Sequence, residues 1–129
     1  MADITNQSLN EIIENVKMKK VSSTELTKAY VKNIESAKKL NAFVTTTFDQ
    51  ALDNAKQFDN KPNFDQLLPG IPLAVKDLFC TENTKTTAGS NILNNFIPSY
   101  ESTVTKNLWD HGSFLLGTVS YTHLTLPTT

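Results

Sequence analysis

The chain of 129 residues is organised around Gly70-Ile71-Pro72-Leu73-Ala74-Val75-Lys76-Asp77-Leu78-Phe79-Cys80. A Gly-Ile-Pro turn leads into a short apolar run, which predicts a buried strand that ends at Lys76. An ammonium group at such a position must be paired, reach solvent, or lower its pKa toward neutrality, where it can transfer protons. Two interpretations follow: Lys76 is a proton-transferring group, or it is a solvated lysine that pairs weakly with an acid.

Three further segments accompany this one in a fixed order, namely Leu40-Asn41-Ala42-Phe43-Val44 before it, and Thr86-Thr87-Ala88-Gly89-Ser90 and Tyr100-Glu101-Ser102-Thr103-Val104 after it. Together the segments resemble the amidase signature family, and the flanking ones are similar to the A subunits of tRNA-dependent glutamine amidotransferases within that family. The resemblance runs from about Thr5 to Gly117. It implies an α/β fold, the N-terminal portion of the amidase signature fold with a mixed sheet flanked by helices, which is incomplete in this chain.

The resemblance also implies a mechanism, in which a Ser, cis-Ser, Lys triad transfers an acyl group and Lys76 occupies the place of the lysine. The protein would release ammonia from glutamine, and a partner subunit would use the ammonia on glutamyl-tRNA. The implied partners are the B and C subunits of a heterotrimeric complex, with tRNA, ATP and Mg held by a partner subunit. The two serines of the family lie in glycine-rich segments that this sequence lacks, so neither serine is assigned here. The substrate-binding residues are unknown.

The amino-acid composition argues against several other kinds of binding site in this chain. The net charge is −1, from 12 lysines and 13 acids, and no run of like charges indicates a nucleic-acid surface. Arginine is absent, so the chain offers no bidentate guanidinium fork for a carboxylate or phosphate. No metal-ligand spacing is present, and a single cysteine excludes an internal disulfide and a multi-cysteine zinc site. Without a leader or an apolar stretch of membrane length, the sequence predicts a cytoplasmic protein that does not enter a membrane.

Two capping boxes, Ser8 with Glu11 and Ser22 with Glu25, predict two amphipathic helices, the first running to about Met18. The plain interpretation is that their apolar stripes pack on the body of the domain. In the resembled family such helices are peripheral and help to form subunit contacts, so a partner surface is the alternative.

A strand is expected over Asn41–Phe48, followed by a short helix capped by Asp49 and a loop from Asp59 to Gln66. A later helix, capped by Ser102 and ended by Gly112, leads into a buried strand at 113–117. Strands that alternate with helices favour parallel pairing, with helices on the faces of the sheet.

The sequence also leads to expectations for one short segment and for several single residues. The Thr86–Ser90 run either lines a pocket or forms a tight loop. Cys80 is expected to fill a core gap rather than act as a nucleophile, Trp109 to be core, and His111 to complement the charge of a helix end. The four apolar residues before Pro98 are expected to pack as a short turn or helical piece; they are Ile92, Leu93, Phe96 and Ile97.

The family-like sequence stops at Gly117. Residues 118–129 carry five threonines and no formal charge apart from a possible one on His123, and they resemble a foreign, artefactual tail. We therefore divide the chain into 1–117, the N-terminal part of an amidase domain, and 118–129, a non-homologous tail expected to be disordered, and we give His123 no functional weight. Two other functions remain open, namely a family hydrolase of small carboxamides and a non-catalytic α/β protein that binds a partner.

Overall fold

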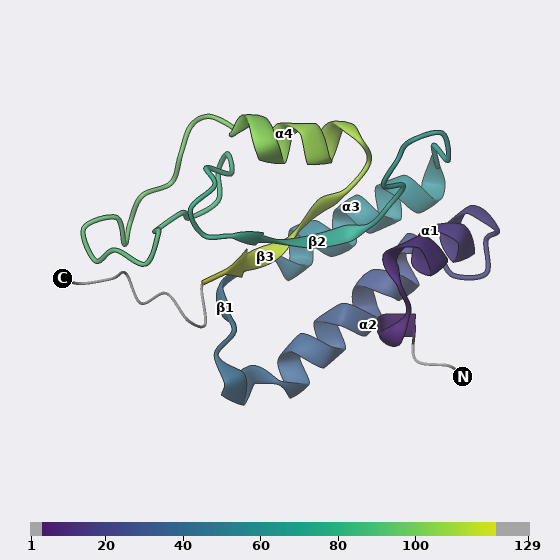
Figure 1. Ribbon diagram of the computed structural model, residues 1–129, viewed down its shortest axis with the longest axis horizontal. Helices are drawn as coiled ribbons and strands as arrows, with labels where there is room; N and C mark the ends of the chain where they lie inside the picture. The colour runs from purple at the N-terminus through teal and green to yellow at the C-terminus, as the bar shows by residue number, and fades with distance from the viewer. Residues whose placement is uncertain (1–3, 121–129) are drawn as a thin grey trace.

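The computed structural model describes residues 4–120 and contains four α-helices, two short 3₁₀ helices and three strands within that range. In chain order they are η1 (Ile4–Asn6), α1 (Leu9–Lys17), α2 (Ser23–Ser36), η2 (Lys38–Leu40), β1 (Phe43–Thr46), α3 (Phe48–Asn60), β2 (Pro72–Lys76), α4 (Thr103–Asp110) and β3 (Phe114–Val119). Figure 1 shows the short sheet at the centre, with α4 on one side and α2 and α3 on the other.

Both predicted capping boxes are confirmed, because in each the serine hydroxyl accepts the N–H of the glutamate three residues on and that glutamate accepts the serine N–H. The bonds measure 3.3 and 2.7 Å for Ser8 with Glu11, and 3.0 and 3.0 Å for Ser22 with Glu25. These contacts are local in sequence and satisfy N–H groups that a helix start would otherwise leave unbonded. The first two helices therefore begin where the sequence predicts.

The prediction that Asp49 caps α3 is wrong. The helix starts one residue earlier, at Phe48, and its N-cap residue Thr47 makes no side-chain capping bond. The Thr47 hydroxyl instead donates to the carbonyl of Leu115 at 3.0 Å, which ties the helix start to β3. Asp49 lies in the first turn, where a negative charge suits the helix dipole. The helix also continues through Asn60, two residues into the predicted loop.

The sheet is mixed, with strand order β1-β3-β2. Parallel pairing is confirmed for β2 with β3, but it is wrong for β1, which runs antiparallel to β3. The reason is that α3 does not carry the chain back over β1. It begins beside β3 at Thr47, and its far end at Phe58 lies against Gly70, where β2 is about to start. The chain thus reverses once between β1 and β2, and not twice.

Two apolar clusters hold the layers together. One joins α1 and α2 to the residue before β2, with buried members Ile12, Val16, Val21, Leu26 and Ile71. The other places Ala51 and Ala55 of α3 against Phe114 and Leu116 of β3. Small residues on α3 let the helix approach the sheet closely, and β3 is buried along almost its whole length. The α/β fold with helices flanking a mixed sheet is therefore confirmed.

The strand predicted at 113–117 starts at Phe114 and ends two residues later than predicted. The strand β3 continues through Thr118 and Val119, and Thr118 is fully buried between β1 and β2. Residues 121–129 lie outside the described residues, and the division into a family-like part, 1–117, and a foreign tail, 118–129, stays a prediction.

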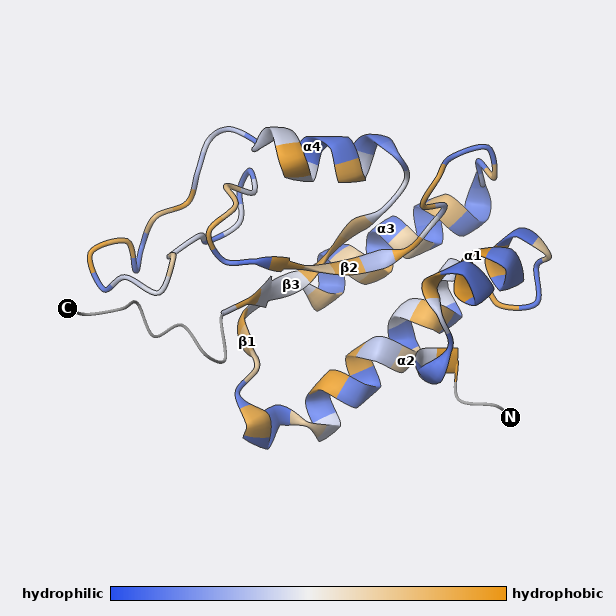
Figure 2. Ribbon diagram, in the orientation of Figure 1, coloured by the Kyte–Doolittle hydropathy of each residue, from blue (hydrophilic) through white to orange (hydrophobic). Residues whose placement is uncertain are grey.

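A long irregular segment joins β2 to α4. Its residues 92–95 form a turn, as predicted, but the apolar side chains predicted to pack there are exposed. The exposed fraction of Ile92 is 95% and that of Ile97 is 59%, with Leu93 and Phe96 also exposed. In Figure 2 the loop between β2 and α4 extends outside the layers of helix and sheet, and hydrophobic parts of it alternate with hydrophilic ones. Along residues 4–120, no helix combines the length and the apolar character that crossing a membrane requires.

Candidate active site

Lys76 is the last residue of β2, and it lies at the edge of the sheet where the carboxyl ends of two parallel strands meet. Its partner in register on β3 is Val119, and the next N–H, that of Asp77, donates to the Val119 carbonyl at 2.9 Å. Ligands of open α/β sheets bind at this edge, because the strands end there and the following loops line the space. The lysine is thus placed where a catalytic group of such a fold is expected.

The local sequence explains why the lysine ends up partly buried. Gly70 turns the chain with φ +64°, Ile71 and Pro72 are buried, and β2 then runs along buried β3. Lys76 is half-buried and its Nζ atom lies out of contact with solvent. Burial lowers the pKa of Lys76 below its ordinary value, and the charge of the neighbouring Asp77 carboxylate opposes that shift.

Asp77 connects this edge to the Thr86–Ser90 loop. Its side chain is 2% exposed, and its carboxylate accepts the backbone N–H of Thr87 at 3.0 Å and the Thr87 hydroxyl in a short hydrogen bond. The Asp77 carbonyl accepts the N–H of Ala88 at 2.7 Å. Three donors from one loop therefore surround one acidic residue.

Of the two interpretations left open for the Thr86–Ser90 run, the structure favours the tight loop. The Thr86 hydroxyl donates to the carbonyl of Thr84 at 3.1 Å, and the Thr87 hydroxyl is bonded to Asp77. Both threonines are buried. Their hydroxyls are thus already engaged in hydrogen bonds that shape the loop. The loop also contains two successive left-handed backbone positions, Ala88 at φ +50° and Gly89 at φ +70°, the second of which a glycine adopts without steric cost.

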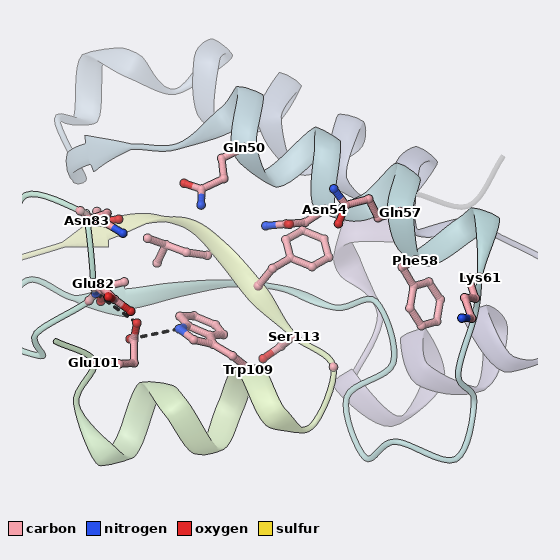
Figure 3. Close-up of a pocket in the computed structure, with 15 residues that line it drawn as sticks. Gln50, Asn54, Gln57, Phe58, Lys61, Glu82, Asn83, Glu101, Trp109 and Ser113 are labelled. Carbon is pink, nitrogen blue, oxygen red and sulfur yellow. Dashed lines mark hydrogen bonds between the residues drawn. The ribbon is translucent and has the colours of Figure 1, made fainter. Parts of the chain in front are cut away.

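One cavity has a volume of about 640 Å³, and Lys76 is not among the residues that line it. Figure 3 shows this cavity between α3 and α4, with the side chains of Gln50, Asn54 and Gln57 projecting from α3. On the α4 side, the indole N–H of Trp109 donates to Glu101 at 3.1 Å. The lysine and this cavity are therefore separate features of the chain.

The structure also shows the surroundings of the three single residues for which the sequence predicts a role. Trp109 is half-buried at the cavity rather than part of either apolar cluster, so its prediction as core is wrong. Cys80 does not fill a core gap either, because it is half-buried in a loop and its thiol contacts the hydroxyl of exposed Tyr100 at 3.4 Å. His111 is the C-cap residue of α4, so its predicted place at a helix end is confirmed, while its role as a charge complement stays a prediction.

Comparison with known proteins gives a consistent result. The family model described as Amidase matches residues 25–126. The chain is 59% identical over 117 residues to the A subunit of the Glutamyl-tRNA(Gln) amidotransferase of Pelagibacter ubique (strain HTCC1062), and 48% identical over 119 residues to that of Parvibaculum lavamentivorans. In both cases the match covers 91% of this chain and 24% of the relative, so the chain spans about a quarter of the length of these relatives.

Among solved structures, the native peptide amidase of Stenotrophomonas maltophilia matches with a TM-score of 0.79 at 28% sequence identity. That match covers 88% of this chain and 24% of the peptide amidase. The arrangement of strands and helices that places Lys76 at the edge of the sheet is therefore shared with much longer proteins.

Proposed function

Since this chain belongs to the amidase family, we propose that it is the N-terminal part of the A subunit of a glutamine-dependent tRNA amidotransferase, with Lys76 as the catalytic lysine. The observation that carries this proposal is the place of Lys76, partly buried at the carboxyl edge of two parallel strands, with a pKa below its ordinary value. The high identity to A subunits of this kind supports the choice of substrate.

The chemistry assigned to Lys76 is that of a general base. Its neutral amine accepts a proton from a bridging serine, which in turn deprotonates the nucleophilic serine that attacks the carboxamide of glutamine. The products of that attack are an acyl-enzyme and ammonia. Because the serines belong to glycine-rich segments absent from this sequence, they must reach the edge formed by β2 and β3 from elsewhere in the whole protein.

The partners follow from the same assignment. The B and C subunits complete the enzyme, and a partner subunit holds the tRNA together with ATP and Mg, so that the ammonia released near Lys76 is used at a second site. This chain has no arginine that could form a fork for phosphate, which agrees with nucleotide and tRNA being held by another subunit.

One member of a triad cannot form an acyl-enzyme, so we expect the 129-residue chain by itself to lack amidase activity. Ammonia release from glutamine above a buffer blank, lost in Lys76→Ala, would refute this expectation.

The choice of substrate is tested in a full-length protein. Residues 1–117 are joined to the remainder of the A subunit of Pelagibacter ubique, and this chimera is assembled with its partner subunits. Ammonia release is then measured with glutamine and with simple carboxamides such as acetamide, and amide transfer is measured on glutamyl-tRNA. We expect turnover of glutamine coupled to amide transfer. Turnover of simple carboxamides without amide transfer would identify a hydrolase instead, and binding of the partner subunits without any turnover would identify a non-catalytic protein.

A further inference from the structure

Asp77 is a buried carboxylate beside Lys76 that the proposed mechanism does not use. A carboxylate removed from water is costly unless donors satisfy it. Here both oxygens are satisfied by one residue, since Oδ1 accepts the Thr87 N–H at 3.0 Å and Oδ2 accepts the Thr87 hydroxyl. The acid therefore ties the end of β2 to a loop ten residues further along the chain.

The backbone of Asp77 is held as firmly as its side chain. The N–H donates to the carbonyl of Val119 on β3 at 2.9 Å, and the carbonyl accepts the N–H of Ala88 at 2.7 Å. A single residue therefore joins β2, β3 and the Thr86–Ser90 loop directly next to Lys76.

The shape of that loop depends on these contacts. Ala88 and Gly89 both have left-handed backbones, an unusual conformation for a residue with a side chain such as Ala88. Thr87 supports both positions, because its hydroxyl accepts the N–H of Gly89 at 3.3 Å and its carbonyl accepts the N–H of Ser90 at 2.9 Å. Since Asp77 orients Thr87, removing the carboxylate should loosen the whole loop.

We propose that Asp77 is a positioning residue of the active site, which clamps the Thr86–Ser90 loop to the edge of the sheet and holds the backbone that carries Lys76. This proposal rests on the proposed role of Lys76 as the catalytic lysine. It assigns Asp77 no contact with the substrate.

The carboxylate also acts on Lys76 through its charge. Burial lowers the pKa of Lys76, and Asp77 works in the opposite direction, keeping that pKa from falling further. The neighbour on β3, Val119, and the Thr86–Ser90 loop carry no charge, whereas the Asp77 carboxylate raises the pKa of Lys76 through its charge. Because the base must be unprotonated, activity rises as the pH rises through the pKa of Lys76.

Two substitutions separate the effect of the Asp77 charge on Lys76 from the effect of the Asp77–Thr87 hydrogen bond on the Thr86–Ser90 loop. Asp77→Asn has nearly the same shape and still accepts the N–H of Thr87, but it is uncharged, so the acid limb of the profile of kcat/KM against pH should move to lower pH. Thr87→Val removes the hydroxyl and leaves the charge. It should leave the limb in place and lower kcat on the order of 10- to 100-fold through misplacement of the loop. Thr87→Ser, which keeps the hydroxyl, should return kcat to the range of the parent.

The measurements use the full-length chimeric protein in its complex, with glutamine as substrate. Asp53→Asn is the control, since Asp53 is exposed and its ion pair with Lys56, at 3.9 Å, lies on the surface. Amide hydrogen exchange of residues 86–90 provides a second readout, expected to be faster in Asp77→Asn and Thr87→Val than in the parent. If Asp77→Asn does not fold, the Thr87→Val and Thr87→Ser pair decides the proposal through kcat and exchange.

The result that would overturn the positioning role of Asp77 differs from the result that would overturn the proposed function. If Lys76→Met is inactive but Asp77→Asn and Thr87→Val leave the acid limb, kcat and exchange unchanged, the positioning role of Asp77 is overturned and the proposed function stands. If Lys76→Met is as active as the parent, the proposed function is overturned and the role of Asp77 falls with it.

Discussion

Gly70 is a position where one added methyl group should damage the fold. Its φ is +64°, and a Cβ atom there would lie 2.6 Å from a ring carbon of Phe58 and 2.9 Å from the Ser23 hydroxyl oxygen. A left-handed backbone with a side chain costs about 1–2 kcal/mol. Forcing an extra carbon into a packed site costs about 1–3 kcal/mol more. Gly70→Ala should therefore lower the free energy of unfolding by about 2–5 kcal/mol, a large share of the ~5–15 kcal/mol typical of proteins.

Gly89 provides the matched control, because its φ is +70° and no atom lies within 4 Å of the position its Cβ would take. Gly89→Ala should lose only the backbone contribution of about 1–2 kcal/mol. The difference between the two variants measures the packing of Phe58 and Ser23 against Gly70. The assay is urea unfolding of the full-length chimeric protein, followed by circular dichroism. Equal losses in the two variants, or a loss below about 0.5 kcal/mol in Gly70→Ala, would refute the packing argument.

Three further predictions concern other parts of the chain. Asp59 on α3 accepts two backbone N–H bonds and a hydroxyl bond at the start of α2, so Asp59→Ala should lower the free energy of unfolding by about 1–2 kcal/mol; an unchanged urea midpoint would contradict this. Hydrogen bonds from the backbone and side chain of Ser8 lower the pKa of Glu11 in the folded state. The ionised Glu11 therefore stabilises the folded chain at a pH above its unfolded-state pKa, and this stabilisation is lost as the pH falls through its folded-state pKa. The stability difference between the parent and Glu11→Gln should therefore shrink below about pH 4, and a constant difference would argue against it. In the 129-residue chain, deletion of residues 121–129 should leave the thermal midpoint unchanged, whereas deletion of 118–129 should lower it because it also removes the buried end of β3; a marked loss in the shorter deletion would make the tail a structural element.

The parts of the fold that the sequence predicts are those set by neighbouring residues. The capping boxes at Ser8 and Ser22 act over three positions, and the buried strand β3 begins with the apolar run Phe114-Leu115-Leu116. The direction of β1 was not predictable in this way. It depends on where α3 comes to lie, and that is decided by contacts between residues far apart, such as Phe58 with Gly70 and Thr47 with Leu115.

In the candidate site, too, some features are set by neighbouring residues and others by contacts between residues far apart in the sequence. Lys76 stands out because a charge ends an apolar run, which can be read from adjacent residues. The bond between Asp77 and Thr87 forms only when the chain folds back, so the adjacency of a lysine and an acid gave no sign of it. The apolar residues Ile92 and Ile97 were predicted to pack because of their type, but packing also needs a surface to cover them, and residues 4–120 leave both exposed.

The most direct test of the account is the glutaminase rate of Lys76→Met in the full-length chimeric protein with its partners. Methionine has a similar length and no charge, so the substitution should leave folding and assembly of the complex intact. The control is Lys85→Met, at a half-buried lysine nine residues along the chain that has no assigned role. We predict that Lys76→Met lowers turnover at least 10²-fold, the minimum typical of a lost general base, while Lys85→Met stays near the parent rate. Turnover of Lys76→Met within about tenfold of the parent would contradict the assignment of Lys76 as the catalytic base.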